Sequence, residues 1–141
     1  MKKTILLMIC SFVLFGCATI ERTGPVHVKI HDSENGTIKE VAQHIEDTKE
    51  LYDSVVVAAD STLVVSYKVK HLHRFQMKEI EKKMKAWLEE KYPDKEIVLS
   101  SDYKIFLELY DLSDQWASDS LSEKEAMEEI EKIIKLKKEM T

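Results

Sequence analysis

Glycine and proline are scarce in this chain, with three Gly and two Pro among 141 residues. Because these residue types mark turns and loops, their scarcity predicts regular elements joined by short connections. An excess of positive charge is also missing, since the formal net charge is −5 at pH 7. The chain therefore lacks the electrostatic signature of a nucleic-acid-binding protein, and we expect no nucleic-acid partner.

Long apolar runs are missing as well. The apolar stretch near the amino terminus, Ile5 to Phe15, is interrupted only by Ser11. It is shorter than the roughly 20 residues that a membrane-spanning helix needs. Lys2 and Lys3 precede it, and a positive segment followed by a short apolar core is typical of a signal peptide.

Cysteine is limited to Cys10 and Cys17, and Cys17 closes a motif. The sequence Leu14-Phe15-Gly16-Cys17 resembles the lipobox of bacterial lipoproteins, in which the thiol accepts diacylglycerol and the small residue before it admits the signal peptidase. We therefore predict a signal peptide over residues 1–16 and lipidation of Cys17. Cys10 would leave with the signal, so no intramolecular disulfide is expected. The alternatives are a plain secretory signal, or an uncleaved anchor, with an incidental cysteine.

The remaining chain is predicted to hold a short tether over residues 17–25, which begins with the lipidated cysteine, and a single α+β domain over residues 26–141. Apolar periodicity predicts the elements of this domain. Strands are expected over 26–32, 55–59, 63–70 and 96–101, and helices over 37–50, 74–92, from Asp102 onward, and from Ser120 or Ser122 onward.

This order gives an extra N-terminal strand, an αββαβ core and two C-terminal helices. The connection from the hairpin into the strand at 96–101 should be a right-handed parallel crossover. We expect the helices to cover one face of a small sheet in two layers. The other face, with Val64, Ser66, Lys68 and Lys70, would then be open, beside a strand edge that could accept a strand from a partner. Trp87 and Trp116 share helical faces with apolar residues and are expected in the core.

Motifs for catalysis are absent from the sequence. There is no Gly-rich phosphate loop, no nucleophile elbow and no zinc-binding His-Glu-x-x-His helix. Glu128, Glu129 and Glu131 alternate with apolar residues as on a solvated helix face. We therefore expect no catalytic residues, no cofactor and no enzymatic activity.

Histidines and a basic stretch are the remaining candidates for binding. His71 and His73 end one predicted strand, and His27 and His31 share a face of another, a spacing that could chelate a metal ion. No cysteine or clear third ligand accompanies them, so exposed histidines are favoured and no metal site is predicted. The stretch "KVKHLHR" (68–74) could face anionic lipid headgroups, although a solvated strand end is the favoured interpretation.

The order of these features resembles a known family. A lipobox, a helix, the hairpin "SVVVAADSTLVVSYKV", a Lys/Glu-rich helix, "EIVLSSD" and an aromatic-containing helix are similar to the YhcN/YlaJ sporulation lipoproteins of endospore-forming bacteria. The resemblance covers roughly residues 36–136. It implies a protein held on a spore membrane that affects germination or outgrowth, and it supplies no catalytic residues. The αββαβ order is also similar to ring-building and BON-type envelope modules, which oligomerise or bind at membranes.

We therefore expect a non-enzymatic lipoprotein on the outer face of the cytoplasmic or spore membrane. Diacylglycerol on Cys17 would anchor it, and the folded part would bind a protein partner or itself. One alternative is a self-assembling, ring-building type of envelope component. A less favoured alternative is a small exported metal-binding or hydrolytic domain.

Overall fold

A computed structural model describes residues 27–32, 38–59 and 61–140 of the chain, with the backbone alone for the first of these segments. Cys17, the predicted signal peptide and tether, and residue 37, where the first predicted helix begins, lie outside the described residues. The elements in chain order are β1 (His27–Asp32), α2 (Lys39–Asp47), β2 (Leu51–Ala59), β3 (Thr62–Val69), the 3₁₀ helix η2 (His71–Gln76), α3 (Met77–Lys91), β4 (Glu96–Ser100), α4 (Tyr103–Ala117) and α5 (Glu123–Glu139).

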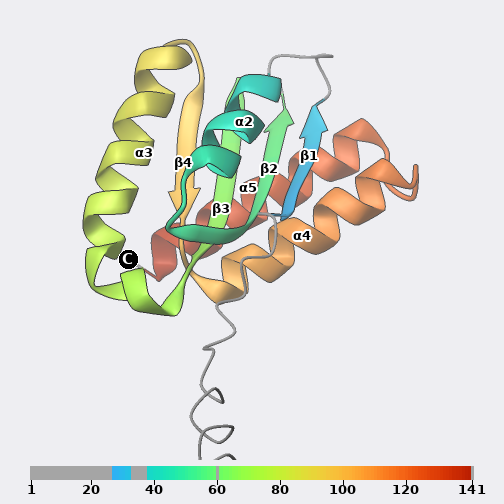
Figure 1. Cartoon of the computed structure of the whole chain (residues 1–141). Coiled ribbons are helices and arrows are strands. Elements are labelled where there is room, and N and C mark those ends of the chain that lie inside the picture. Colours follow the sequence, from blue (N-terminus) through green and yellow to red (C-terminus); the bar gives the residue numbers. More distant parts are fainter. Residues whose placement is uncertain (1–26, 33–37, 60, 141) are drawn as a thin grey trace, which may run out of the picture.

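The four strands form one mixed sheet in the order β1-β2-β3-β4 (Figure 1). β1 and β2 are parallel, β2 and β3 form an antiparallel hairpin, and β3 and β4 are parallel. The α+β class, the αββαβ core, the additional N-terminal strand and the parallel crossover through α3 are therefore confirmed. Because β3 lies between β2 and β4, it is an interior strand, and the edges of the sheet are β1 and β4.

Helices α2 and α3 cover one face of the sheet. The side chains pointing to that face from β2 and β3 alternate along each strand, as the pleat requires. This first core comprises Ile38, Val41, Ile45, Leu51, Val56, Ala58, Leu63, Val65, Tyr67, Val69, Ile80, Met84, Leu88 and Leu99.

Helices α4 and α5 cover the opposite face (Figure 1). The second core comprises Val55, Val57, Ala59, Val64, Val98, Ile105, Phe106, Leu109, Leu112, Trp116, Ala126, Ile130 and Ile133. This arrangement corrects our two-layer expectation: the face predicted to be open is buried, with Val64 1% and Ser66 0% exposed. The sheet lies in the middle of three layers.

Side-chain hydrogen bonds cap the starts of α4 and α5. The Asp102 carboxylate accepts hydrogen bonds from the backbone N–H groups of Lys104 and Ile105 at 2.8 and 3.2 Å, so Asp102 caps α4 as predicted. Ser122 and Glu125 form a capping box at the start of α5. The helix predicted over 74–92 is shorter, because residues 71–76 form η2 before α3 begins.

Candidate functional site

We call one end of the sheet the entry end, because β1, the first described strand, starts there. Register pairs His27 at the start of β1 with Asp53 in β2, and Asp53 with Lys68 near the end of β3. Ser66 in turn pairs with Ser100 at the end of β4. The chain therefore enters the described domain at the same end of the sheet from which β3 leads into η2 and β4 leads into α4 (Figure 1).

The η2 turn is the most exposed apolar feature of the described residues. Phe75 is 100% exposed and Leu72 is 74% exposed, and no residue of η2 is buried. In a 3₁₀ helix, side chains three positions apart lie on the same side. Leu72 and Phe75 therefore form one apolar ridge, while His71 and Arg74 form a neighbouring basic ridge. The sequence contains no acidic residue from Lys68 to Lys78.

Exposed apolar side chains are concentrated at the entry end. Six large apolar side chains are exposed among the described residues: Tyr52, Leu72, Phe75, Tyr103, Leu107 and Met140. Tyr52 is the second residue of β2 and Tyr103 is the first residue of α4, so both lie at the entry end together with the two residues of η2. Four of the six therefore belong to one end of the sheet.

Lys68 does not belong to this exposed surface, although it belongs to the predicted basic stretch. Its ammonium group lies 3.4 Å from the Asp53 carboxylate and 3.8 Å from the centre of the Phe106 ring. The side chain is thus held under α4, on the face opposite α2 and α3. The basic stretch is divided, and the charges that remain toward solvent are those of Lys70 and of η2.

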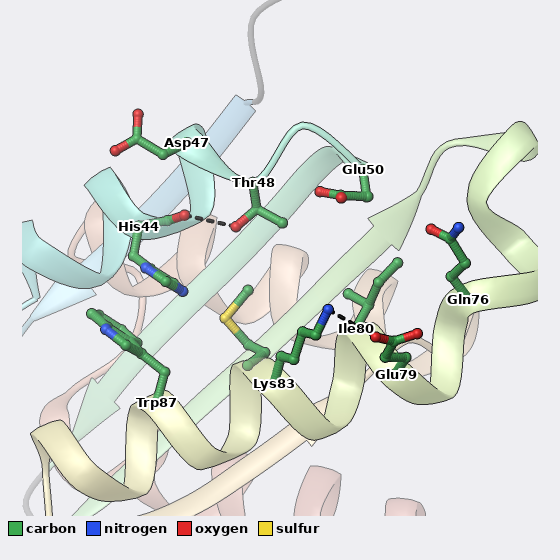
Figure 2. A pocket seen from close by; sticks show the side chains of 10 residues that line it. His44, Asp47, Thr48, Glu50, Gln76, Glu79, Ile80, Lys83 and Trp87 are labelled. Atoms are coloured by element: carbon green, nitrogen blue, oxygen red, sulfur yellow. Dashed lines mark hydrogen bonds and ion pairs between the residues drawn. The ribbon is translucent and has the colours of Figure 1, made fainter.

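A groove of about 560 Å³ lies between α2 and α3, over the first core (Figure 2). Ile80 and Met84 of α3 are buried at its floor, and Trp87 and His44 stand together at one end. Gln76, the last residue of η2, lines the other end, so the groove runs toward the exposed turn.

His44 and Trp87 close the groove by stacking. Their ring centres are 3.8 Å apart and the rings are tilted by 3°. Burial lowers the pKa of His44 below its usual 6.5, against the opposing effect of the nearby Asp47 carboxylate. The carbonyl of His44 also accepts a hydrogen bond from the Thr48 hydroxyl at 2.8 Å, which fixes the end of α2. The stacked His44 and Trp87 rings are therefore uncharged at neutral pH and form one end of the groove.

The rim of the groove is acidic. Asp47 and Glu50 come from the end of α2 and the connection to β2, and Glu79 comes from α3. Among the described residues that line the groove, Lys83 is the only lysine or arginine, and its Nζ lies 2.8 Å from the Glu79 carboxylate. Their mutual hydrogen bond lowers the pKa of Glu79 and raises that of Lys83, so both are charged at neutral pH. One cation faces three carboxylates, and the rim is therefore net negative.

The structure separates the candidates that the sequence suggested. His71 is exposed, and the Nδ1 of His73 lies 3.4 Å from the side-chain oxygen of Gln76. Within the described part of the chain, no group of three or more His, Cys, Asp or Glu side chains could hold a metal ion. Trp116 is buried in the second core as predicted, whereas Trp87 is only partly buried and lines the groove.

Sequence reasoning missed both the groove and the exposed ridge, but one signal was available for the ridge. Counting back from Ile80 by three, four, seven and eight positions reaches Met77, Gln76, His73 and Leu72, but not Phe75. Phe75 therefore lies off the stripe that faces the core.

No family model, no curated protein and no solved structure matches this chain. In the segments that the structure describes, no helix has the length and apolar character needed to cross a membrane.

Proposed function

We propose that this protein is a lipid-anchored, non-enzymatic module of the cell envelope or spore membrane, held by diacylglycerol on Cys17, which binds a segment of a partner protein. The lipobox-like sequence supports the anchor, and the resemblance to sporulation lipoproteins supports the compartment. The topology is compatible with an anchor at Cys17, because β1, the first described strand, starts at one end of the sheet.

The observation that carries the binding role is the groove between α2 and α3. Its apolar floor, at Ile80 and Met84, suits an apolar side chain, and its net negative rim suits lysine or arginine beside it. Several groups that line the groove have structural partners: Glu79 pairs with Lys83, and the Thr48 hydroxyl bonds the backbone of α2. This favours recognition of a basic and apolar segment over chemistry on a substrate.

The anchor is tested by replacing each cysteine separately. In Cys17→Ser we expect loss of labelling by a fatty-acid probe, together with movement to the soluble fraction or a block in processing. Cys10→Ser is the matched control, because that residue is predicted to leave with the signal peptide. Unchanged labelling and fractionation of Cys17→Ser would exclude the lipoprotein interpretation.

The groove is tested by a photo-reactive amino acid placed at position 83 in intact cells, with position 132 on α5 as the control. We expect an adduct from position 83 whose cross-linked peptide contains lysine or arginine beside an apolar residue. Reversing the rim charge with Glu50→Lys and Asp47→Lys should abolish that adduct, because the attraction becomes repulsion. An adduct that survives both reversals, or that forms equally at position 132, would contradict a partner site in this groove.

A further inference from the structure

The η2 turn is exposed in a manner that the fold itself does not explain. A fully exposed phenylalanine beside a largely exposed leucine contributes nothing to either core, and each leaves apolar surface in water. The sequence keeps polar or basic residues around them, namely Lys70, His71, His73 and Arg74. An apolar ridge with cationic neighbours is the pattern of surfaces that lie in the interface of a bilayer.

The distance between the predicted anchor at Cys17 and the start of β1 bears on which surface could cover this turn. The chain between positions 17 and 27 spans at most about 36 Å when fully extended. A domain of this size has a radius of gyration of about 13 Å. An acyl chain on Cys17 would therefore keep the domain within about its own diameter of the lipid surface.

With Cys17 anchored as proposed, the tether would join the domain at the entry end. His27 starts β1 at the end of the sheet where β3 leads into η2, and Tyr52 and Tyr103 add exposed rings at the same end. Tyrosine suits the headgroup region of a bilayer, where its ring is apolar and its hydroxyl remains hydrated.

We infer that η2 is a membrane-contact site: Leu72 and Phe75 insert into the interface of an anionic bilayer while Lys70 and Arg74 contact its phosphate groups. The orientation rests on the proposed anchoring at Cys17, whereas the affinity of the turn for lipid does not. The bilayer contact occupies the entry end and leaves the groove between α2 and α3 beside it, with Gln76 belonging to both surfaces.

Affinity is measured with the chain from residue 18 to residue 141. Every buried core residue lies between Ile38 and Ile133, so this chain retains both cores. We expect it to sediment with vesicles that contain phosphatidylglycerol, and to do so less with phosphatidylcholine alone or at high salt. No binding to the anionic vesicles would overturn the inference.

Paired variants separate the apolar and the charged contributions. Leu72→Ser with Phe75→Ser should lower binding at least about 10-fold, since the inserted area is lost. Lys70→Glu with Arg74→Glu should also lower it at least about 10-fold on anionic vesicles. The matched controls are Leu107→Ser on α4 and Lys124→Glu with Lys132→Glu on α5, which should change binding less than two-fold. Equal losses in the controls would contradict a site at η2.

Self-association through the same ridge is the competing outcome. Sedimentation velocity without lipid should show a monomer in both the wild type and the Leu72→Ser/Phe75→Ser variant. A dimer that this variant dissociates would show that the ridge is an interface between copies, and would overturn the bilayer assignment.

The acylated mature protein, which begins at Cys17 and lacks Cys10, provides the second readout. In a Phe75→Cys variant, an environment-sensitive fluorophore reacts with the new thiol at position 75, because the thiol of Cys17 is already bound to lipid. A Lys124→Cys variant carries the same fluorophore on α5 as a control. We expect a blue-shifted emission from position 75 alone. If Cys17 is acylated but the emission from position 75 is that of a probe in water, the membrane contact is contradicted and the anchor still stands. If the protein binds vesicles through η2 but Cys17 is not acylated in cells, the anchor is contradicted and the membrane contact still stands.

Discussion

Phe75 and Ile80 are close in the sequence and have opposite surroundings. Phe75 is 100% exposed on η2, whereas Ile80 is 8% exposed on α3 and packs in the first core. Phe75 is five residues before Ile80 and lies off the helical stripe that leads back from it, so its side chain points to solvent. The side chain's position on its element, and not its hydrophobicity, determines whether it stabilises the fold.

Ile80→Asp is predicted to unfold the domain. The substitution places a carboxylate without a partner in the first core, which costs several kcal/mol, and we expect at least about 3 kcal/mol of lost stability in chemical denaturation. Lys82→Asp is the matched control, because Lys82 is exposed on the same helix. A native-like unfolding midpoint for Ile80→Asp would mean that this face of α3 does not contact the core.

His44 is predicted to make stability depend on pH in mildly acidic solution. Burial against Trp87 lowers its pKa in the folded state, so the unfolded chain binds a proton at higher pH than the folded one. Stability contributed by the neutral ring is therefore complete above about pH 6.5 and is lost as the pH falls from there through the lower pKa of the folded state. Unfolding at pH 7.5 and 5.5 should show a smaller loss for His44→Gln than for the wild type. An equal loss would contradict this role.

At the level of elements, the sequence predicted those whose signals are local. Alternation in "TLVVSYKV" and the chemistry of Asp102 determine β3 and the start of α4 within a few residues. The boundaries that shifted depend on contacts elsewhere: β2 begins at Leu51, four residues before the expected strand, because pairing with Val69 extends the hairpin. Backbone pairing partners are not visible in a single strand's own pattern.

Ser122 is predicted to be the residue that starts α5. The sequence allowed either Ser120 or Ser122, and in the structure Ser122 forms the capping box, whereas the Ser120 hydroxyl bonds that of Ser118 at 2.8 Å. Ser122→Ala should cost about 1 kcal/mol of stability, since the backbone N–H of Glu125 loses its acceptor. Ser120→Ala is the matched control and should cost clearly less in the same thermal unfolding measurement. Equal costs would argue against a cap at Ser122.

The layering of the helices could not be derived from the elements alone. α4 and α5 each have an apolar stripe, and such a stripe is compatible with either face of a sheet. The strands β2 and β3 are apolar on both faces, with Val64 and Val65 adjacent and both buried, which indicates a sheet covered on both sides. The interruptions at Ser66 and Lys68 concealed this signal: Ser66 bonds the carbonyl of Ser100 at 3.1 Å, and Lys68 pairs with Asp53.

The exposed features of the described domain lie at different places on it. The sheet separates two cores, its entry end carries four of the six exposed large apolar side chains, and the groove lies on one side of it. Of these surfaces, the sequence indicated the basic stretch but assigned it to a solvated strand end. The groove needs α2 and α3 side by side, and the concentration of exposed rings needs the register of four strands. The groove and the cluster of exposed rings arise from tertiary packing, so the pattern of a single sequence segment does not predict them.

Removing α4 and α5 is predicted to destroy the fold, and this tests the three-layer arrangement directly. A chain that ends at Asp102 exposes Val55, Val57, Val64 and Val98, which these helices cover. Apolar surface of this kind drives aggregation, so we expect an insoluble or dye-binding product without a cooperative thermal transition.

A chain that ends at Glu139 is the control, and it should unfold with the cooperativity and midpoint of the wild type. If the chain ending at Asp102 stays monomeric and melts cooperatively, α2, α3 and the sheet form a complete two-layer domain. The second core would then be an accessory to the fold.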